Sequence, residues 1–93
     1  MRDYELTLIF RPDLGDEAAA GATERVGGWI TASGGEIGNI ANAGRKRLAF
    51  PIKHSRDGTY VVMQVRTRPQ ALGEIERNLK LANDVLRYIF LRR

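Results

Sequence analysis

The sequence predicts an α+β fold in which four strands and two helices follow one another along a single chain. Three observations carry this prediction. The 93 residues suffice for one hydrophobic core but not for two. Apolar residues alternate with polar ones in strand-like segments and recur with helical spacing in two others. No linker, internal repeat or low-complexity stretch separates these segments, so we expect one domain over residues 1–93.

The first strand is predicted from Asp3 to Arg11. Its alternate positions, which share one face of a strand, are apolar: Tyr4, Leu6, Leu8 and Phe10. Turn-forming residues follow from Pro12 to Gly15, and we expect Asp16 to cap the helix that comes next.

This first helix is predicted to run to about Ser33, where Gly34 and Gly35 end it. The positions spaced for one buried face are Ala18, Ala22, Val26, Trp29 and Ile30. Inside the helix, Gly27 and Gly28 each cost roughly 1 kcal/mol relative to Ala. We therefore expect tertiary packing to hold this helix, and the two glycines to allow a close approach to the sheet.

A long second strand is predicted over residues 36–52, with a bulge or bend near Asn42 to Gly44. The residues alone leave open an equal alternative, in which Asn39 to Gly44 is a loop. Pro51 lacks an N–H group and would break a ladder hydrogen bond in a central strand. We therefore expect this strand to lie at a sheet edge.

The polar stretch from Lys53 to Gly58 predicts a connection in which Asp57-Gly58 is the hairpin turn. A third strand follows from Thr59 to Thr67. One of its faces is apolar, with Val61, Met63 and Val65.

Pro69 suits the first position of a second helix, since its missing N–H would be unpaired there in any case. The apolar stripe of this helix consists of Leu72, Ile75, Leu79 and Ala82. Asn83-Asp84 closes it, and a fourth strand is predicted over Val85 to Leu91.

The element order is therefore β-α-β-β-α-β. Two right-handed crossovers and a central hairpin then give a ferredoxin-like sandwich. In this fold a four-stranded antiparallel sheet carries both helices on one face. Strands one and three are central and strands two and four are edges, which agrees with the position of Pro51.

Charge is divided unevenly between the two halves of the chain. Residues 1–43 carry three Arg against seven acids, a net charge of −4, and residues 44–93 carry twelve Lys or Arg against four acids, a net charge of +8. Most of these cations are arginines, whose planar fork donates paired hydrogen bonds to phosphate. The distribution favours a polyanionic partner.

The strongest candidate for contact with that partner is the run Gly44 to Ile52, where Arg45, Lys46 and Arg47 lead into an apolar segment. Strand alternation places Arg45 and Arg47 on one face and Lys46 on the other. The other cations of the basic half assigned to nucleic-acid binding are Arg87, Arg92 and Arg93. A protein partner is expected to pack on Phe50, Tyr60 and Val62.

Features of an enzyme are sparse. The chain has no cysteine, and His54 has no second histidine with which to share a metal, so it reads as a solvated loop residue. Glu74 and Glu76 face different directions on a helix and disfavour an acid pair. The loop after the first strand lacks the glycine-rich phosphate cradle of acylphosphatases, which share this fold. We expect no catalytic residues, no cofactor, no metal and no small-molecule substrate.

The chain also lacks a run of about 18 apolar residues, and its start lacks the apolar region of a signal peptide. We therefore expect a cytoplasmic protein without a membrane partner. RNA-recognition motifs share this element order, but their third strand stacks bases on several aromatic residues. Tyr60 is the sole aromatic residue of the third strand here, so phosphate contacts should dominate over base stacking.

Several residues together resemble the bacterial small-subunit ribosomal protein six family. They are Tyr4-Glu5, Pro12, Leu14, Gly35, the run Gly44-Arg45-Lys46-Arg47-Leu48-Ala49-Phe50-Pro51-Ile52, Gly58, Tyr60 and Val85-Leu86-Arg87. The match spans nearly the whole chain in order and spacing. Phe50 stands where the family usually has tyrosine, which removes a hydroxyl group and keeps the ring.

The resemblance implies a structural constituent of the small ribosomal subunit with a ferredoxin-like fold and no catalytic role or cofactor. It also implies binding to the central domain, or platform, of 16S ribosomal RNA together with small-subunit ribosomal protein eighteen. Among the cations, the matching block carries Arg45 to Arg47 over to RNA contact, and the resemblance also implies RNA contact for Arg2 and Arg87. The alternative is a ligand-sensing regulatory domain of the ACT type, which has the same element order.

Overall fold

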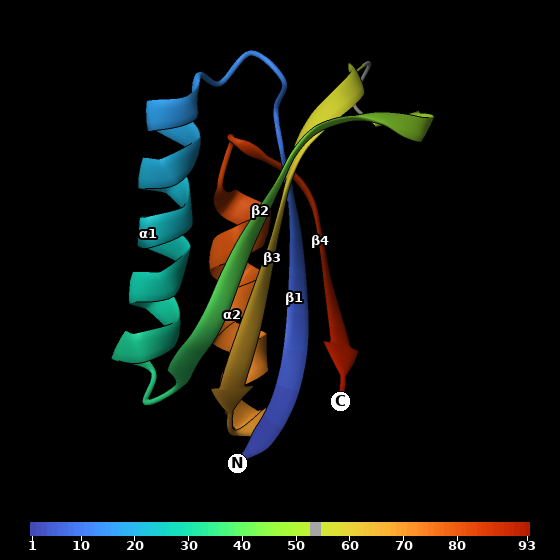
Figure 1. Cartoon of the computed structure of the whole chain (residues 1–93). Helices are drawn as coiled ribbons and strands as arrows, with labels where there is room; N and C mark the ends of the chain where they lie inside the picture. Colours follow the sequence, from blue (N-terminus) through green and yellow to red (C-terminus); the bar gives the residue numbers. More distant parts are fainter. Residues whose placement is uncertain (53–54) are drawn as a thin grey trace.

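The computed structural model describes residues 1–52 and 55–93. Its four strands form one antiparallel sheet in the order β2-β3-β1-β4. The predictions for Lys53 and His54 lie outside the described residues. The elements are β1 (Arg2–Phe10), α1 (Asp16–Ala32), β2 (Glu36–Ile52), β3 (Ser55–Thr67), the 3₁₀ turn η1 (Pro69–Ala71), α2 (Leu72–Leu81) and β4 (Val85–Arg92). Figure 1 shows both helices on one face of the sheet. The ferredoxin-like prediction is confirmed, with strands one and three in the centre.

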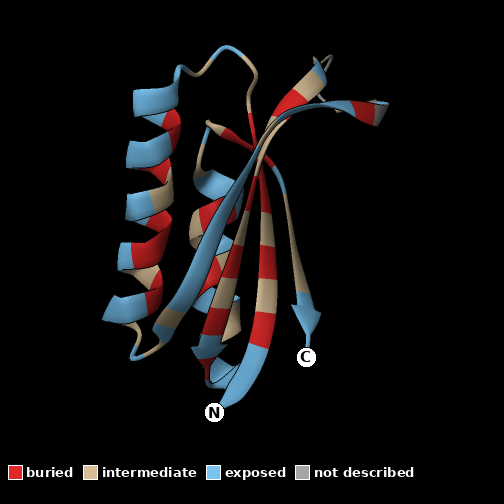
Figure 2. Cartoon of the chain, viewed as in Figure 1, coloured by how far each residue is buried: buried red, intermediate tan, exposed pale blue. Residues whose placement is uncertain are grey.

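The hydrophobic core lies between this face and the helices (Figure 2). All four alternate positions predicted for β1 are buried, as are Val61, Met63 and Val65 of β3. Burying each large aliphatic or aromatic side chain contributes roughly 1.5–3 kcal/mol. From the helices, the buried side chains are Ala19, Ala22, Val26, Ile30, Ile75 and Leu79. The period of the sequence therefore identified the buried faces of β1 and β3 and most of the buried positions of the two helices.

Helix α1 corrects two predictions. Asp16 is the first residue of the helix rather than its cap. The cap position is occupied by Gly15, which has no side chain that could accept a hydrogen bond from the helix. Ala18 is exposed and Ala19 is buried in its place. Ala22 and Val26 define the buried stripe. Ala19 continues this stripe toward the start of the helix because it lies three positions before Ala22, about one helical turn.

One of the two helix glycines serves the close approach to the sheet. A Cβ atom on Gly27 would lie 2.9 Å from Cδ1 of Ile37 in β2, whereas a Cβ atom on Gly28 would meet open space. Two backbone hydrogen bonds end the helix, from N–H of Gly34 to O of Thr31 and from N–H of Gly35 to O of Ile30. With φ of 89° at Gly34, this is a Schellman motif.

Strand β2 is one continuous bent strand, not a strand interrupted by a loop. Asn42 pairs with Val61 and Gly44 with Tyr60, so Ala43 is an extra residue that forms a bulge. Gly44 has φ of 79°, and its N–H donates to Oδ1 of Asn42 at 2.9 Å. Glycine is suited to this left-handed conformation, which explains the predicted bend.

The prediction of a hairpin turn at Asp57-Gly58 is wrong. Both residues belong to β3, where they pair with Arg47 and Lys46 of β2. Gly58 is buried, and a Cβ atom there would collide with Cγ2 of Ile9 in β1. The glycine is required for close packing within the sheet rather than for a turn.

The second half of the chain follows its prediction closely. Pro69 occupies the start of η1, from which α2 continues, and β4 extends one residue beyond the predicted end. Ile75 and Leu79 are buried, while Leu72 and Ala82 are half-buried. Among the described residues no helix is both long and apolar enough to cross a membrane.

Candidate nucleic-acid and protein interface

Strands β2 and β3 continue beyond the rest of the sheet. The pairing of β3 with β1 ends at Thr59, so residues 55–58 pair with β2 alone. We call residues 45–52 and 55–58 the distal ribbon. In Figure 1 it bends away from the sheet at the end opposite the chain termini. Leu48 and Gly58 of the ribbon are buried, but its charged residues Arg45, Lys46, Arg47 and Arg56 are exposed and accessible to a large partner.

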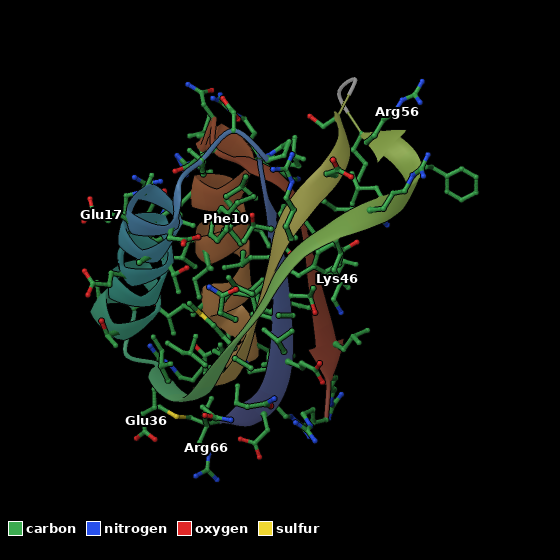
Figure 3. The ribbon with its side chains drawn as sticks, turned by 45° about the horizontal axis from the view of Figure 1, so that its top comes forward. Phe10, Glu17, Glu36, Lys46, Arg56 and Arg66 are labelled. Carbon is green, nitrogen blue, oxygen red and sulfur yellow. The ribbon has the colours of Figure 1, made fainter. Side chains whose placement is uncertain are left out.

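The distal ribbon carries four described cations, Arg45, Lys46, Arg47 and Arg56, against the single acid Asp57. Nη2 of Arg45 lies 3.5 Å from Oδ2 of Asp57, and both side chains are exposed. Arg47 and Arg56 have no ion pair among residues 1–52 and 55–93. Figure 3 shows Arg56 projecting from this end and Lys46 nearer the middle of the sheet. Such weakly neutralised guanidinium groups are suited to phosphate oxygens.

Alternation along the ribbon separates its cations as predicted. Lys46 lies opposite Gly58, and its Nζ atom lies 5.7 Å from the ring centroid of Tyr60. Tyr60 belongs to the sheet face that no helix covers, which we call the open face. Arg45 and Arg47 therefore lie on the other face of the ribbon. The ammonium group of Lys46 therefore makes a cation–π contact with the ring of Tyr60.

An apolar hollow lies on the open face next to the ribbon. It is lined by Ile9, Leu48, Phe50, Ile52, Tyr60, Arg87 and Ile89. Ile9 and Leu48 are buried there without help from a helix, together with Leu86 of β4. Phe50 is 80% exposed. We call these seven residues the open-face hollow.

The open-face hollow brings together two of the three residues predicted to meet a protein partner, Phe50 and Tyr60. The third, Val62, is half-buried and does not line it. Ile9 and Ile89 were missed by sequence reasoning. The available signal was that Ile9 is an apolar residue between polar neighbours on one face of the first strand, and that Ile89 shares a face of the last strand with the apolar Leu91.

The seven cations predicted to bind RNA do not form one surface. Arg87 lines the open-face hollow near the distal ribbon, whereas Arg2 and Arg92 lie toward the end that carries both termini (Figure 1). Arg93 is also at that end, where its guanidinium donates to Oε1 of Gln64. Strand length explains the separation, since β1 and β4 run the length of the sheet.

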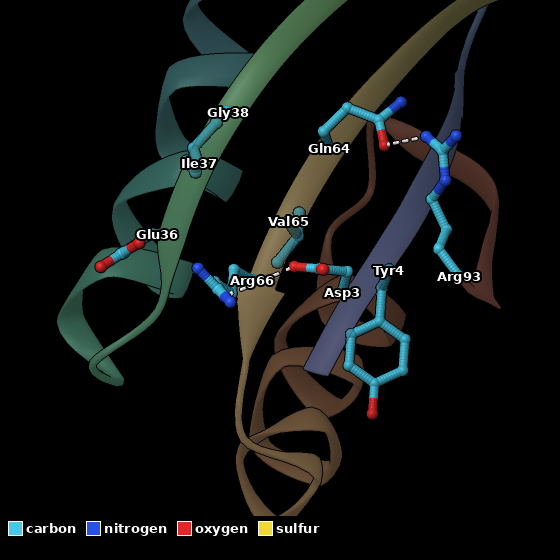
Figure 4. A pocket seen from close by; sticks show the side chains of 9 residues that line it. All are labelled: Asp3, Tyr4, Glu36, Ile37, Gly38, Gln64, Val65, Arg66 and Arg93. Carbon is cyan, nitrogen blue, oxygen red and sulfur yellow. Dashed lines mark hydrogen bonds and ion pairs between the residues drawn. The ribbon is translucent and has the colours of Figure 1, made fainter. Parts of the chain in front are cut away.

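The terminal end also has a basin, shown in Figure 4. It is lined by the two carboxylates of Asp3 and Glu36 and by the two guanidinium groups of Arg66 and Arg93. Nε of Arg66 lies 3.5 Å from Oδ1 of Asp3. Because its charges are of both signs, this basin is less suited to a polyanion than the distal ribbon is.

Other charged groups serve local structure. Arg11 donates two hydrogen bonds to Asp13, and these lower the pKa of Asp13 below its ordinary value. In the part of the chain that the structure describes, no group of three His, Cys, Asp or Glu side chains is arranged to hold a metal ion.

Comparison with known proteins gives consistent matches. The profile of the family Ribosomal protein S6 matches residues 3–92. Small ribosomal subunit protein bS6 of Moorella thermoacetica is 37% identical over 92 residues, covering 99% of this chain and 94% of the relative. The protein of the same name from Caldanaerobacter subterraneus subsp. tengcongensis is 38% identical over 92 residues, covering 99% and 97%.

Solved structures of similar fold agree with these sequence matches. The crystal structure of 30S ribosomal protein S6 from Thermotoga maritima superposes with a TM-score of 0.93 at 29% identity, covering 99% of this chain and 87% of that one. The C-terminal domain of the MgtC protein from Mycobacterium tuberculosis reaches a TM-score of 0.66 at 14% identity, covering 100% and 88%. The second likeness concerns the fold alone. These matches do not favour the alternative of an ACT-type sensor.

Proposed function

Because the chain belongs to the ribosomal protein S6 family, we propose that it binds the central domain of 16S ribosomal RNA together with small-subunit ribosomal protein eighteen. Membership of this family makes the chain a structural, non-enzymatic protein of the small ribosomal subunit, and so ribosome-associated and cytoplasmic. The RNA and the specific protein partner are the proposed part.

The observation that carries the RNA proposal is the excess of cations on the distal ribbon. Arg45, Lys46, Arg47 and Arg56 are opposed there by one acid among the described residues, Asp57. Because each phosphate contact releases condensed counterions, a small cluster of this kind gives binding that weakens steeply with salt. Such contacts position a protein on RNA and carry little sequence information.

We assign the protein partner to the open-face hollow. Its apolar residues and the exposed ring of Phe50 leave a surface that is costly to keep in water. Val62, next to it on the same face, extends the proposed contact. Partner and RNA would then meet the chain on adjacent surfaces, because Lys46 and Arg87 border the hollow on its ribbon side and its β4 side.

Adjacent contacts explain why the two partners should act together. A domain that makes only a few phosphate contacts binds RNA weakly by itself. Joining it to a second RNA-binding protein raises the effective concentration of each for the same RNA. Arg2, Arg92 and Arg93, at the other end of the sheet, form a separate and smaller proposed contact.

Co-sedimentation with small ribosomal subunits tests the function. We expect the chain to travel with the subunits at low salt and to be released as salt is raised, because ion contacts hold it. Omitting protein eighteen from reconstituted subunits should reduce the bound fraction. A chain that stays in the supernatant as a dimer at every salt concentration would instead behave as a ligand-sensing domain.

A further inference from the structure

A groove without an assigned role runs between helix α2 and strand β4. It is lined by Leu79 and Lys80 of the last turn of α2, and by Val85, Leu86, Arg87 and Tyr88 of β4. Its volume is about 210 Å³, several times the roughly 30 Å³ that one water molecule occupies in the liquid. We call it the edge groove. It is large enough for a side chain from another molecule.

One wall of the edge groove is the free edge of the sheet. β4 is the last strand in the order β2-β3-β1-β4 and pairs with β1 on one side only. Within residues 1–52 and 55–93 no strand pairs with its other side. Alternate backbone N–H and C=O groups of β4 therefore point outward and are open to a further strand.

The groove combines buried apolar side chains with exposed cations. Of the lining residues, Leu79, Val85 and Leu86 are almost completely buried. Lys80 and Arg87 are exposed and have no ion pair in the described part of the chain. None of the lining residues is acidic.

We propose that the edge groove binds an extended acidic segment of a partner protein, which adds to β4 as a fifth strand. Main-chain hydrogen bonds to the β4 edge would give affinity, as in other complexes in which a peptide is added to a sheet beside a helix. An apolar side chain of the segment would enter the groove beside Leu79. Carboxylates of the segment would pair with Lys80 and Arg87.

Charge disfavours a second copy of this chain as the occupant. Pairing of two β4 edges about a two-fold axis would bring Arg87 and Arg92 of both chains to one shared edge, without a carboxylate among the groove residues to offset them. Cations gathered along one shared edge repel one another and weaken the pairing of two copies. The same cations favour an acidic segment.

A synthetic peptide of about eight residues, with alternating valine and threonine and one glutamate near each end, is the probe. Titration into the full chain should shift the backbone amide NMR signals of Lys80 and of β4. Alternate β4 amides that exchange rapidly in the free chain should become protected. A peptide with lysine in place of glutamate should bind more weakly. Shifts confined to the open-face hollow, or equal binding of both peptides, would overturn the proposal.

The matched variants are Lys80→Glu and Arg77→Glu, since both residues are exposed cations on α2 but only Lys80 lines the groove. Lys80→Glu should lower peptide affinity about fivefold or more, because an exposed ion pair is lost and a repulsion is added. Arg77→Glu should leave it nearly unchanged. Equal effects of the two variants would show a general charge effect and contradict the proposal.

Two further measurements separate this inference from the proposed ribosomal function, on which it does not depend. Lys80→Glu should still co-sediment with small subunits, and its loss from them would assign Lys80 to ribosome binding instead. The free chain should sediment as a monomer. A concentration-dependent dimer that the glutamate peptide cannot dissociate would make a second copy the occupant and overturn the assignment.

Discussion

Arg25 of helix α1 forms an ion pair with Asp84, the residue before β4, although 59 positions separate them in the sequence. The guanidinium group of Arg25 also lies 5.8 Å from the ring centroid of Trp29. Asp84 is mostly buried, and its Oδ1 atom has no hydrogen-bond partner among the described residues. The pair joins the first helix to the beginning of the last strand.

Arg25→Ala should therefore destabilise the chain by about 1 kcal/mol, because it leaves a largely buried carboxylate without its charged donor. Urea denaturation at neutral pH measures the change. Arg77→Ala, at an exposed position without an ion pair among residues 1–52 and 55–93, is the control and should lie within about 0.5 kcal/mol of the parent. Equal effects of the two variants would refute a structural role for the pair.

Gly58→Ala should cost about 1–3 kcal/mol of folding free energy, because the new methyl group collides with Ile9 inside the sheet. Gly73→Ala is the matched control. Gly73 lies in α2 with open space around it, so alanine should stabilise the chain by about 0.4–1 kcal/mol. Adding Ile9→Leu, which removes the β-branched methyl Cγ2, to Gly58→Ala should recover part of the loss if the collision is its cause.

The double variant Arg45→Ala with Arg47→Ala should weaken binding of ribosomal RNA by the chain and protein eighteen together. Each lost phosphate contact lowers the slope of log affinity against log salt by about 0.7–0.9, so two contacts lower it by roughly 1.4–1.8. Filter binding at several salt concentrations gives this slope. An unchanged affinity and slope would remove both residues from the RNA contact. Arg77→Ala is again the matched control and should leave the affinity and the slope nearly unchanged.

Phe50→Asp should abolish binding to protein eighteen and leave stability nearly unchanged, because the ring is 80% exposed in the free chain. Calorimetric titration measures the first effect and thermal unfolding the second. Val62→Asp should weaken the same binding less, since Val62 lies beside the open-face hollow and not in it. Full binding by the Phe50 variant would move the partner interface elsewhere.

The pKa of Asp13 should lie below the ordinary value of about 3.9, because Arg11 donates two hydrogen bonds to the ionised carboxylate. Since the folded-state pKa is the lower one, the pair contributes stability above the unfolded-state pKa. That contribution is lost as pH falls through the folded-state pKa. NMR titration should show the midpoint of Asp13 rising in Arg11→Gln. An unchanged midpoint would mean that the two side chains do not pair in solution.

Local pattern predicted most of the fold. Alternation identified the core face of β1 at all four positions, and Pro51 placed β2 at the sheet edge. The misplaced hairpin turn has a physical cause, since Asp-Gly marks a turn only where no neighbour requires the glycine. Here Ile9, on a different strand, requires Gly58. A side chain 49 positions away is invisible to a local pattern.

The candidate site was less predictable than the fold. The sequence singled out Arg45, Lys46 and Arg47, and the structure places them on a projecting ribbon. It did not show that Arg87 lies near them while Arg2 and Arg92 lie at the other end. Ile9 was missed because its open-face neighbours on β1 are polar, and Ile89 because it lies between Arg87 and the exposed Leu91 on the open face of β4.

By itself, the sequence determined the order of the elements, their buried faces and the concentration of cations after residue 44, because side-chain period and charge are local properties of the chain. Only the tertiary structure decided which cations share a surface, that β2 continues through its bulge, and that an apolar hollow and an edge groove lie beside β4. These features depend on the register of strands that are distant in sequence. Register is set by packing between the strands and the helices, not by the residues of any one segment.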